Sequence, residues 1–185
     1  MAEYHVNLPL TEEDIRNFKA GDIVYLSGRL ISGRDAAHKR IATAFGEQTP
    51  LPVDLRGETI YYVGPCPTPP GKIIGSAGPT TSGRMDSYTP TMLKLGIKGM
   101  IGKGERSPEV IAAIQKHQAV YFAALGGAGA LIARSIKFAK VIAYPDLGPE
   151  AIYRLEVENL PVFVVIDASG DNLYRLGREK YQKNQ

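Results

Sequence analysis

The chain has 185 residues, a hydrophobic fraction of 44% and a charged fraction of 22%, which are ordinary values for a globular protein and exclude extensive disorder. The net charge of +3 is too small to indicate nucleic-acid binding and suits small acidic substrates. The one cysteine, Cys66, excludes an internal disulfide framework. We expect a single domain over residues 1–185 with a polar tail from about residue 177. The first ten residues lack the basic and apolar segments of a secretory signal, so we expect a cytoplasmic protein.

The first seventy residues are rich in strand patterns. Thr11 is followed by three acidic residues, which predicts the capped start of a helix. Apolar residues at helical spacing predict a second helix within residues 32–45. Arg34 stands at its N-terminus, where the helix dipole disfavours a cation unless an anion docks there. A proline-rich loop follows at 65–70. The strands expected in this part are residues 4–8, 23–31 and 59–64.

The segment that dominates the sequence runs from Gly75 to Asp86 and is made mostly of small residues. We expect a short strand over 72–74 to lead into it and several of its backbone N–H groups to point outward together. Together with the hydroxyls of Thr80 and Thr81 and the guanidinium of Arg84, these groups suit a carboxylate or phosphate. The alternative is that a threonine only caps a helix and the glycines only serve the turn.

The rest of the chain alternates between strand and helix patterns. Because this alternation extends from residue 72 to residue 167, we expect a mainly parallel sheet with covering helices. The strand-rich first part is consistent with a second sheet layer. The expected helices are 88–96, 107–117 and a segment after 126, with a further helix start at 148–153. The expected strands are 98–104, 119–125, 140–144 and 161–167.

Two familiar nucleotide-binding motifs are incomplete. The turn at 102–104 lacks both the earlier glycine and the following serine or threonine of a phosphate-binding loop. The segment 127–129 follows a strand and opens a helix, but Ile132 occupies the third glycine position of a dinucleotide fingerprint. The three histidines are far apart, and one thiol cannot hold an iron–sulfur cluster. We therefore predict no metal ligand and no cofactor ligand in this chain.

Basic residues follow several predicted strands. Arg34, Arg84 and Lys103 stand on such turns, with Arg106 as a further candidate. Loops at the carboxyl ends of strands in an open α/β sheet converge on one crevice. Because each guanidinium can pair with a carboxylate through two hydrogen bonds, this set suits a small dicarboxylate.

Four ordered motifs carry a resemblance to a known family. They are similar to class I (iron–sulfur) fumarate hydratases and the related tartrate dehydratases. The motifs are residues 32–40, residues 75–86, residues 101–104, and the pair of segments 148–152 and 162–167. The similarity is to the C-terminal half of these enzymes, which in many organisms is a separate beta subunit. It extends from about Tyr4 to about Leu176.

The resemblance implies a fold, an activity and a partner. The fold would be an α/β, three-layer β/β/α swivelling domain with a mainly parallel central sheet. The activity would be the reversible hydration of fumarate to (S)-malate. The enzyme would use a four-iron, four-sulfur (4Fe-4S) cluster held by an alpha subunit, not by this chain, in a heterotetramer. The beta subunit of L-tartrate dehydratase is the alternative within the class. A non-catalytic module that binds an anion or a dinucleotide is the alternative from another class.

The resemblance also implies roles for individual residues. It implies that Arg34, Arg84 and Lys103 bind the substrate and that Thr80 abstracts the carbon-bound proton. A free hydroxyl is a weak base, so Thr80 would need nearby positive charge and N–H groups to stabilise its alkoxide.

Three further residues lie in the same motifs and are expected to support the site. His38 would orient the arginine one helical turn before it, Asp86 would close the turn that carries Arg84, and Thr81 would stand beside the proposed base.

Overall fold

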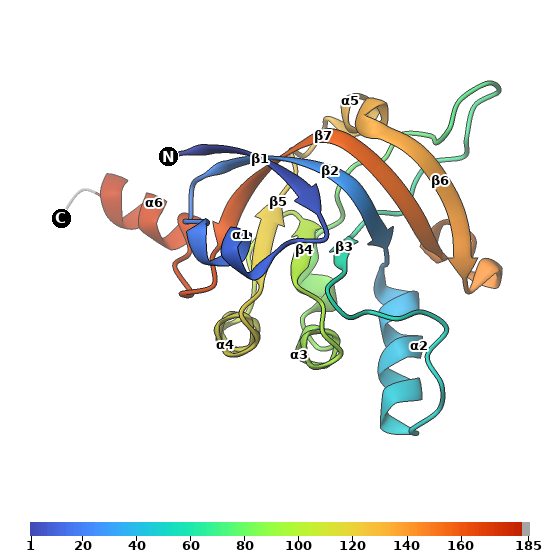
Figure 1. The fold of residues 1–185 in the computed structure, drawn as a ribbon, viewed down its shortest axis with the longest axis horizontal. Helices are drawn as coiled ribbons and strands as arrows, with labels where there is room; N and C mark the ends of the chain where they lie inside the picture. Colours follow the sequence, from blue (N-terminus) through green and yellow to red (C-terminus); the bar gives the residue numbers. More distant parts are fainter. Residues whose placement is uncertain (183–185) are drawn as a thin grey trace.

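The computed structural model describes residues 1–182. They form a mixed α/β structure with one seven-stranded sheet (Figure 1). Its strands are β1 (Glu3–Leu8), β2 (Ile23–Ser32), β3 (Thr59–Tyr61), β4 (Gly99–Gly102), β5 (Val120–Ala123), β6 (Ile136–Ala143) and β7 (Ile152–Ile166). The α-helices are α1 (Glu12–Asn17), α2 (Asp35–Gly46), α3 (Thr89–Lys94), α4 (Pro108–His117), α5 (Gly129–Ser135) and α6 (Leu173–Tyr181). Two 3₁₀ helices are η1 (Ser82–Met85) and η2 (Pro145–Glu150).

The sheet is mainly parallel, as the sequence predicts. Its order is β1-β2-β3-β4-β5-β7-β6, and the neighbours from β1 to β5 are parallel. The long strand β7 is antiparallel to β5 and β6, and it also pairs antiparallel with β2. Strands β2, β3, β4, β5 and β7 therefore form a closed circuit of pairings. The carboxyl ends of β2 to β5 all lie at one edge of the sheet.

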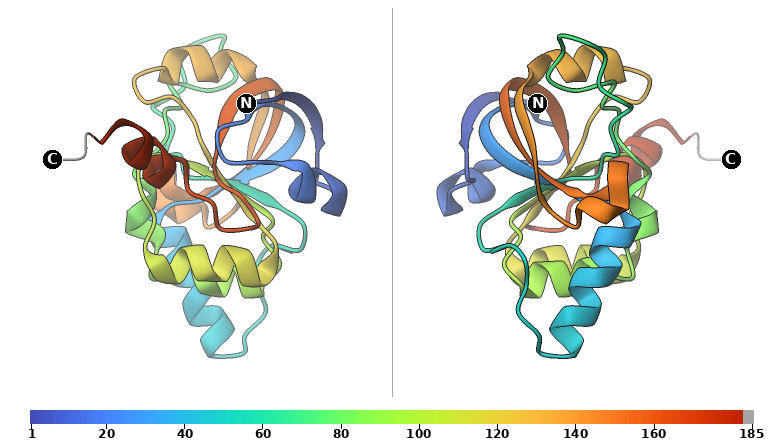
Figure 2. Two further views of the ribbon diagram at one scale, coloured as in Figure 1. Left: turned by 90° about the vertical axis from the view of Figure 1, so that its left-hand side faces the viewer. Right: turned by 90° about the vertical axis from the view of Figure 1, so that its right-hand side faces the viewer.

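Two apolar cores hold the elements together. Helices α2, α3 and α4 cover one side of the sheet, and α5 lies on the opposite side (Figure 2). Ile41, Met92 and Ile114 of these three helices pack in one core. Phe18 and Ile132 pack in the other, against β-strand residues. Burial of these apolar side chains is the main stabilising contribution to the fold.

The helix starts follow the signals in the sequence. The Thr11 side chain accepts a hydrogen bond from the backbone N–H of Asp14, and the Asp14 carboxylate accepts one from the N–H of Thr11. Ser107 caps α4 in the same way, with Pro108 at the first helical position. Gly96 ends the α3 segment with a φ of 101°, a conformation that favours glycine.

The strand expected over 72–74 is wrong. Residues 72–74 belong to no strand and lie in the long loop between β3 and η1. The loop folds on itself, because the backbone N–H of Cys66 donates to the carbonyl of Ser76 at 2.9 Å. A Cβ at Gly75 would lie 2.2 Å from the Cys66 carbonyl oxygen, so this close approach requires glycine. Two consecutive isoleucines, Ile73 and Ile74, do not form a strand where no neighbouring strand pairs with them.

The helix start expected at 148–153 is also wrong. Gly148 has a φ of 56°, which interrupts η2, and the chain continues as β7 from Ile152. The antiparallel part of this mainly parallel sheet lies in the same region. The connection from β6 to β7 is too short for a crossover, so the two strands pair antiparallel.

The expected polar tail is partly helical. Residues 177–181 belong to α6, whose first turn is capped by the Asn172 side chain. The last three residues of that tail lie outside the described residues. Within residues 1–182, none of the helices combines the length and the apolarity needed to cross a bilayer.

Candidate functional site

The candidate residues lie at the carboxyl ends of neighbouring parallel strands. Arg34 follows β2 and caps α2, and Lys103 follows β4. Strand β3 lies between them in the sheet. A Cβ at Gly64, just after β3, would lie 2.5 Å from Nη1 of Arg34, so the Arg34 side chain runs across the end of β3. Parallel pairing thus brings together residues that are about seventy positions apart.

The glycine-rich segment crosses the same edge. Pro79 forms an isolated antiparallel bridge with Val63, and Thr81 forms a parallel bridge with Lys103. The backbone N–H of Thr80 donates to the carbonyl of Tyr62 at 2.7 Å. These contacts place Thr80 beside the end of β3 and Thr81 beside Lys103.

The expectation that several N–H groups of this segment point outward is wrong for three of them. The N–H groups of Ala77, Thr80 and Ser82 donate to carbonyls of Gly129, Tyr62 and Lys103 respectively. A segment that crosses strand ends uses its donors to join the sheet, because buried backbone donors need partners. Positive charge at this edge comes from side chains.

Two of the candidate cations meet at one carboxylate. Asp35 Oδ1 accepts a hydrogen bond from Arg84 Nε at 2.9 Å, and its Oδ2 lies 3.8 Å from Arg34 Nε. The structure thus brings Arg34 and Arg84 together from α2 and η1. The Arg84 side chain is 51% exposed and the Arg34 side chain 20% exposed. Arg84 is therefore the more accessible of the two to a ligand.

Glu150 compensates the positive charge of Arg34 at the N-terminus of α2, where the helix dipole disfavours a cation. Its Oε2 accepts a hydrogen bond from the backbone N–H of Ala36 at 3.0 Å, and its Oε1 lies 3.3 Å from Arg34 Nη2. A carboxylate at a helix N-terminus satisfies a free donor and offsets the cation. Sequence reasoning missed both acidic partners. Asp35 is adjacent to Arg34 and was recognisable as a first-turn acid, whereas nothing local indicates Glu150.

His38 lies beneath Arg34 and is fully buried. Burial lowers the pKa of His38 to about 4, so the imidazole is neutral near pH 7. Its Nδ1 lies 2.8 Å from the Arg34 carbonyl oxygen and therefore carries the proton that it donates. Its ring meets that of Tyr62 edge-on at 5.4 Å. His38 therefore helps to hold Arg34 through the Arg34 backbone carbonyl.

Asp86 and Arg106 form an ion pair in which the arginine side chain is fully buried and the aspartate side chain is 16% exposed. Asp86 Oδ1 accepts from Arg106 Nε and Oδ2 accepts from the backbone N–H of Ser107, each at 2.6 Å. The Arg106 side chain is fully buried and its guanidinium lies over the rings of Tyr62 and Tyr121 at 5.4 and 4.9 Å. The expectation that Arg106 joins the ligand-facing cations is wrong. The Asp86 side chain fixes Arg106 and the start of α4, whereas its backbone N–H closes the turn that carries Arg84 by donating to the Gly83 carbonyl at 3.2 Å.

Ser82 is a further anchor that the sequence did not reveal. Its buried hydroxyl accepts from the backbone N–H of Lys103 at 3.0 Å and lies 2.9 Å from the Tyr121 hydroxyl. A Cβ at Gly102 would lie 2.0 Å from the Ser82 hydroxyl oxygen. Ser82 therefore locks η1 to the end of β4 and fixes the turns that carry Arg84 and Lys103.

The described residues do not fit an iron–sulfur cluster. Within residues 1–182, no group of three or more His, Cys, Asp or Glu side chains lies close enough to hold a metal ion. The one thiol, Cys66, is exposed in the proline-rich loop. A cubane cluster requires several thiolates, so no chemical step is assigned to a cluster held by this chain.

The chain is similar to known proteins along almost its whole length. Residues 2–177 match the model of the family described as Fumarase C-terminus. Fumarate hydratase 2 of Leishmania major is 40% identical over 164 residues, which are 88% of this chain and 29% of that protein. The anaerobic class I fumarate hydratase of Escherichia coli K12 is 38% identical over 174 residues, 92% of this chain and 32% of that protein.

A third relative has nearly the same length as this chain. It is provisionally named L(+)-tartrate dehydratase subunit beta, from Methanocaldococcus jannaschii, and is 37% identical over 188 residues. The match covers 98% of this chain and 96% of that protein. In contrast, the chain spans about a third of the length of the two fumarate hydratases. The extent of the family match and these identities show that the chain belongs to the Fumarase C-terminus family.

Proposed function

We propose that the chain is the beta subunit of a heteromeric class I fumarate hydratase, a hydro-lyase that adds water reversibly to fumarate to give (S)-malate. The observation that carries the proposal is the convergence at one sheet edge of two arginines, a lysine and a threonine from three separate segments. Arg34 and Arg84 share the Asp35 carboxylate, and Lys103 pairs with Thr81 next to Thr80. A four-carbon diacid has two carboxylates, which such a set of cations recognises.

In this proposal the arginines and the lysine bind and orient the substrate. Arg84 is half exposed, and its guanidinium already holds a carboxylate, that of Asp35. A substrate carboxylate would bind beside the Asp35 carboxylate or replace it on the Arg84 guanidinium, and the other side chains of the site would keep their positions. Arg34 is held from two sides by Glu150 and by the backbone contact to His38, which limits its movement. Preorganised cations of this kind lose little free energy to reorganisation when the ligand binds.

Thr80 is the proposed base for the carbon-bound proton. The hydrogen bond from its backbone N–H to the Tyr62 carbonyl fixes its backbone, so the Thr80 side chain starts from a fixed position beside the end of β3. Nearby positive charge lowers the pKa of a hydroxyl by stabilising the alkoxide. Arg84 and Lys103 are the charges of this site that the proposal assigns to that role, with Thr81 as a neighbouring hydroxyl.

The proposal includes an alpha subunit that holds the 4Fe-4S cluster and completes the site. It is supported by the subunit name of the full-length relative and by the greater length of the two fumarate hydratases. A heterotetramer, a three-layer β/β/α swivelling architecture and a cytoplasmic location belong to the same proposal. Each partner would contribute what the other lacks, because the described residues here supply cations and a hydroxyl and no cluster ligands.

The test is reconstitution. The chain is assayed alone and after anaerobic assembly with an alpha-type chain from the same genome, and the loss of the ultraviolet absorbance of fumarate is followed. We expect activity only in the assembled sample. Turnover of fumarate by the chain alone, or an inactive assembled complex, would contradict the proposal.

The beta subunit of an L-tartrate dehydratase is the second candidate. It is favoured by the relative that matches this chain end to end. The same assembled sample is assayed with L-tartrate, and a kcat/KM higher for tartrate than for fumarate would establish it. Tight binding of a nicotinamide cofactor by the chain alone would instead favour a non-catalytic binding module.

A further inference from the structure

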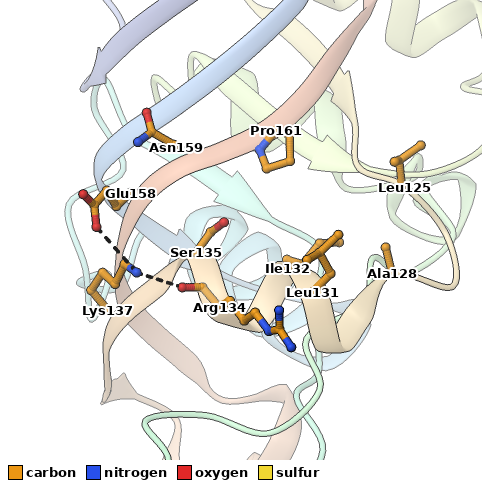
Figure 3. Close-up of a pocket in the computed structure, with 10 residues that line it drawn as sticks. All are labelled: Leu125, Ala128, Leu131, Ile132, Arg134, Ser135, Lys137, Glu158, Asn159 and Pro161. Atoms are coloured by element: carbon orange, nitrogen blue, oxygen red, sulfur yellow. Dashed lines mark hydrogen bonds and ion pairs between the residues drawn. The ribbon is translucent and has the colours of Figure 1, made fainter.

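A group of exposed apolar side chains surrounds helix α5. Leu125, Leu131 and Ile73 are 53%, 58% and 51% exposed, and they come from the β5–α5 loop, from α5 and from the loop before η1. Leu125 and Leu131 line one cavity of about 390 Å³, shown in Figure 3, and Ile73 lines another of about 540 Å³. Arg134 borders both cavities. These four residues are called the α5 patch below.

The α5 patch combines exposed apolar side chains from three segments. The other exposed large apolar side chains of the described secondary-structure elements lie away from α5: Phe45 on α2, Ile142 on β6, and Leu176 and Tyr181 on α6. Single exposed apolar residues are normal, whereas neighbouring ones around a cavity mark a surface that another molecule covers. The inner side of α5 is already buried, since Ile132 is 3% exposed. The outer side is therefore the side left for a partner.

The α5 patch is continuous with the candidate site. The carbonyl of Gly129 accepts a hydrogen bond from the backbone N–H of Ala77 at 3.0 Å, so α5 begins against the segment that leads to Thr80. A Cβ at Gly126, next to Leu125, would lie 3.8 Å from Cδ of Lys103. A molecule that covers the site from this direction also meets the patch.

The rim of the patch is mainly basic. Lys72, Arg134 and Lys137 lie around the two cavities. Lys137 lies 3.5 Å from Glu158 and donates to the carbonyl of Arg134, as the dashed lines in Figure 3 show. The complementary partner carries apolar side chains at its centre and carboxylates around them.

We propose that the α5 patch is the docking surface for the alpha subunit, a proposal that rests on the proposed function. The fumarate hydratase relatives are about three times as long as this chain, while the full-length relative is named as a subunit. The larger part of those hydratases has no counterpart within these 185 residues, and in the proposed function the alpha subunit supplies it. It must approach the edge that carries Thr80 and Lys103, and the patch is the exposed apolar surface that adjoins that edge.

The experiment measures association of the full chain with the alpha-type chain by sedimentation velocity and by surface-bound titration. Leu131→Asp and Leu125→Asp are compared with the wild type. Ile142→Asp is the matched control, because Ile142 is also apolar and exposed, at 39%, but lies on β6 outside the patch. We expect each patch variant to weaken association at least tenfold and the control to leave it unchanged. Circular dichroism and thermal unfolding check that each variant folds.

A charge reversal provides a second measurement. Arg134→Glu should weaken association more at low salt than at high salt, since rim charges are screened. Wild-type affinity of both leucine variants would overturn the proposal. The chain could instead self-associate in a way that Leu131→Asp abolishes, while binding of the alpha-type chain stays unchanged. This result would assign the patch to a second copy of the chain and would also overturn the proposal.

The outcomes separate this proposal from the proposed function. An active complex that forms equally well with the patch variants refutes the docking surface and leaves the hydratase function standing. An inactive complex whose formation depends on Leu131 refutes the function and leaves the docking surface standing. No association of the wild-type chain with the alpha-type chain refutes the docking surface.

Discussion

Removal of the Asp86 carboxylate should destabilise the protein strongly, because it leaves the buried Arg106 guanidinium without a counter-charge, although the Thr89 hydroxyl still accepts a hydrogen bond from its Nη2. Arg106 has no exposed side-chain surface, and Asp86 is its only ion-pair partner within residues 1–182. Breaking a buried pair by removing one member costs about 3–5 kcal/mol. Asp86→Ala also removes the acceptor of the Ser107 N–H, which adds to the same loss.

The assay is thermal and urea unfolding of Asp86→Ala beside Asp54→Ala. Asp54 also pairs with an arginine, Arg56, but both side chains are exposed, so this control should leave the melting temperature almost unchanged. For a chain of this size, about 1 kcal/mol corresponds to a shift of about 2–4 °C in the melting temperature. We therefore expect Asp86→Ala to melt about 10 °C lower than the wild type.

A double variant separates the lost charge pair from lost packing. In Asp86→Ala/Arg106→Met the buried cation is gone, and a methionine packs well against the rings of Tyr62 and Tyr121. We expect this variant to recover much of the lost stability, as buried pairs replaced by apolar residues often do. An Asp86→Ala melting temperature equal to that of the Asp54→Ala control would refute the reasoning.

Four more outcomes are expected. Arg84→Lys should lower kcat/KM of the assembled enzyme about 100-fold with an unchanged melting temperature, since a point charge does not reproduce a two-pronged carboxylate contact; an unchanged kcat/KM removes Arg84 from the site. Thr80→Ala should abolish turnover while Thr80→Ser retains it, and normal kcat for Thr80→Ala would exclude the hydroxyl as base. Because the folded pKa of His38 is about 4 against an ordinary 6.5, the unfolded chain takes up the proton first as the pH falls. The stability from neutral His38 is complete above about pH 6.5 and should fall by about 3 kcal/mol towards pH 4, a loss that urea titrations of His38→Gln should not show. Gly102→Ala should destabilise by about 1–3 kcal/mol because its Cβ would overlap a buried hydroxyl, whereas Gly46→Ala, with no atom within 4 Å of the new Cβ, should not; equal midpoints in urea would contradict this.

Local features of the fold could be predicted because their causes are local. The cap at Thr11 and the start at Ser107–Pro108 each depend on groups within three residues of one another. Errors arose where pairing at a distance decided the structure. The 148–153 segment has a helix-like start in sequence, but the strand that follows pairs with β2 and β6 and draws the chain into extended conformation.

The site shows the same division. Arg34, Arg84 and Lys103 could be selected from the sequence because each stands on or beside a glycine-containing turn, although only Arg34 and Lys103 directly follow a strand and Arg84 lies in η1. Arg106 looks the same in sequence, yet it is buried against two tyrosines. Whether a cation faces a ligand or a buried carboxylate depends on which other segments pack around it.

The sequence by itself determined the family, the capped starts of α1 and α4 and the set of candidate basic residues, because ordered motifs and capping groups are properties of neighbouring residues. Only the tertiary structure decided that Asp35 joins the two arginines and that Glu150 holds Arg34. It alone also placed Ser82 between η1 and the end of β4. Those contacts join segments that are far apart along the chain, and they exist because parallel strands β2 to β4 end side by side at one edge of the sheet.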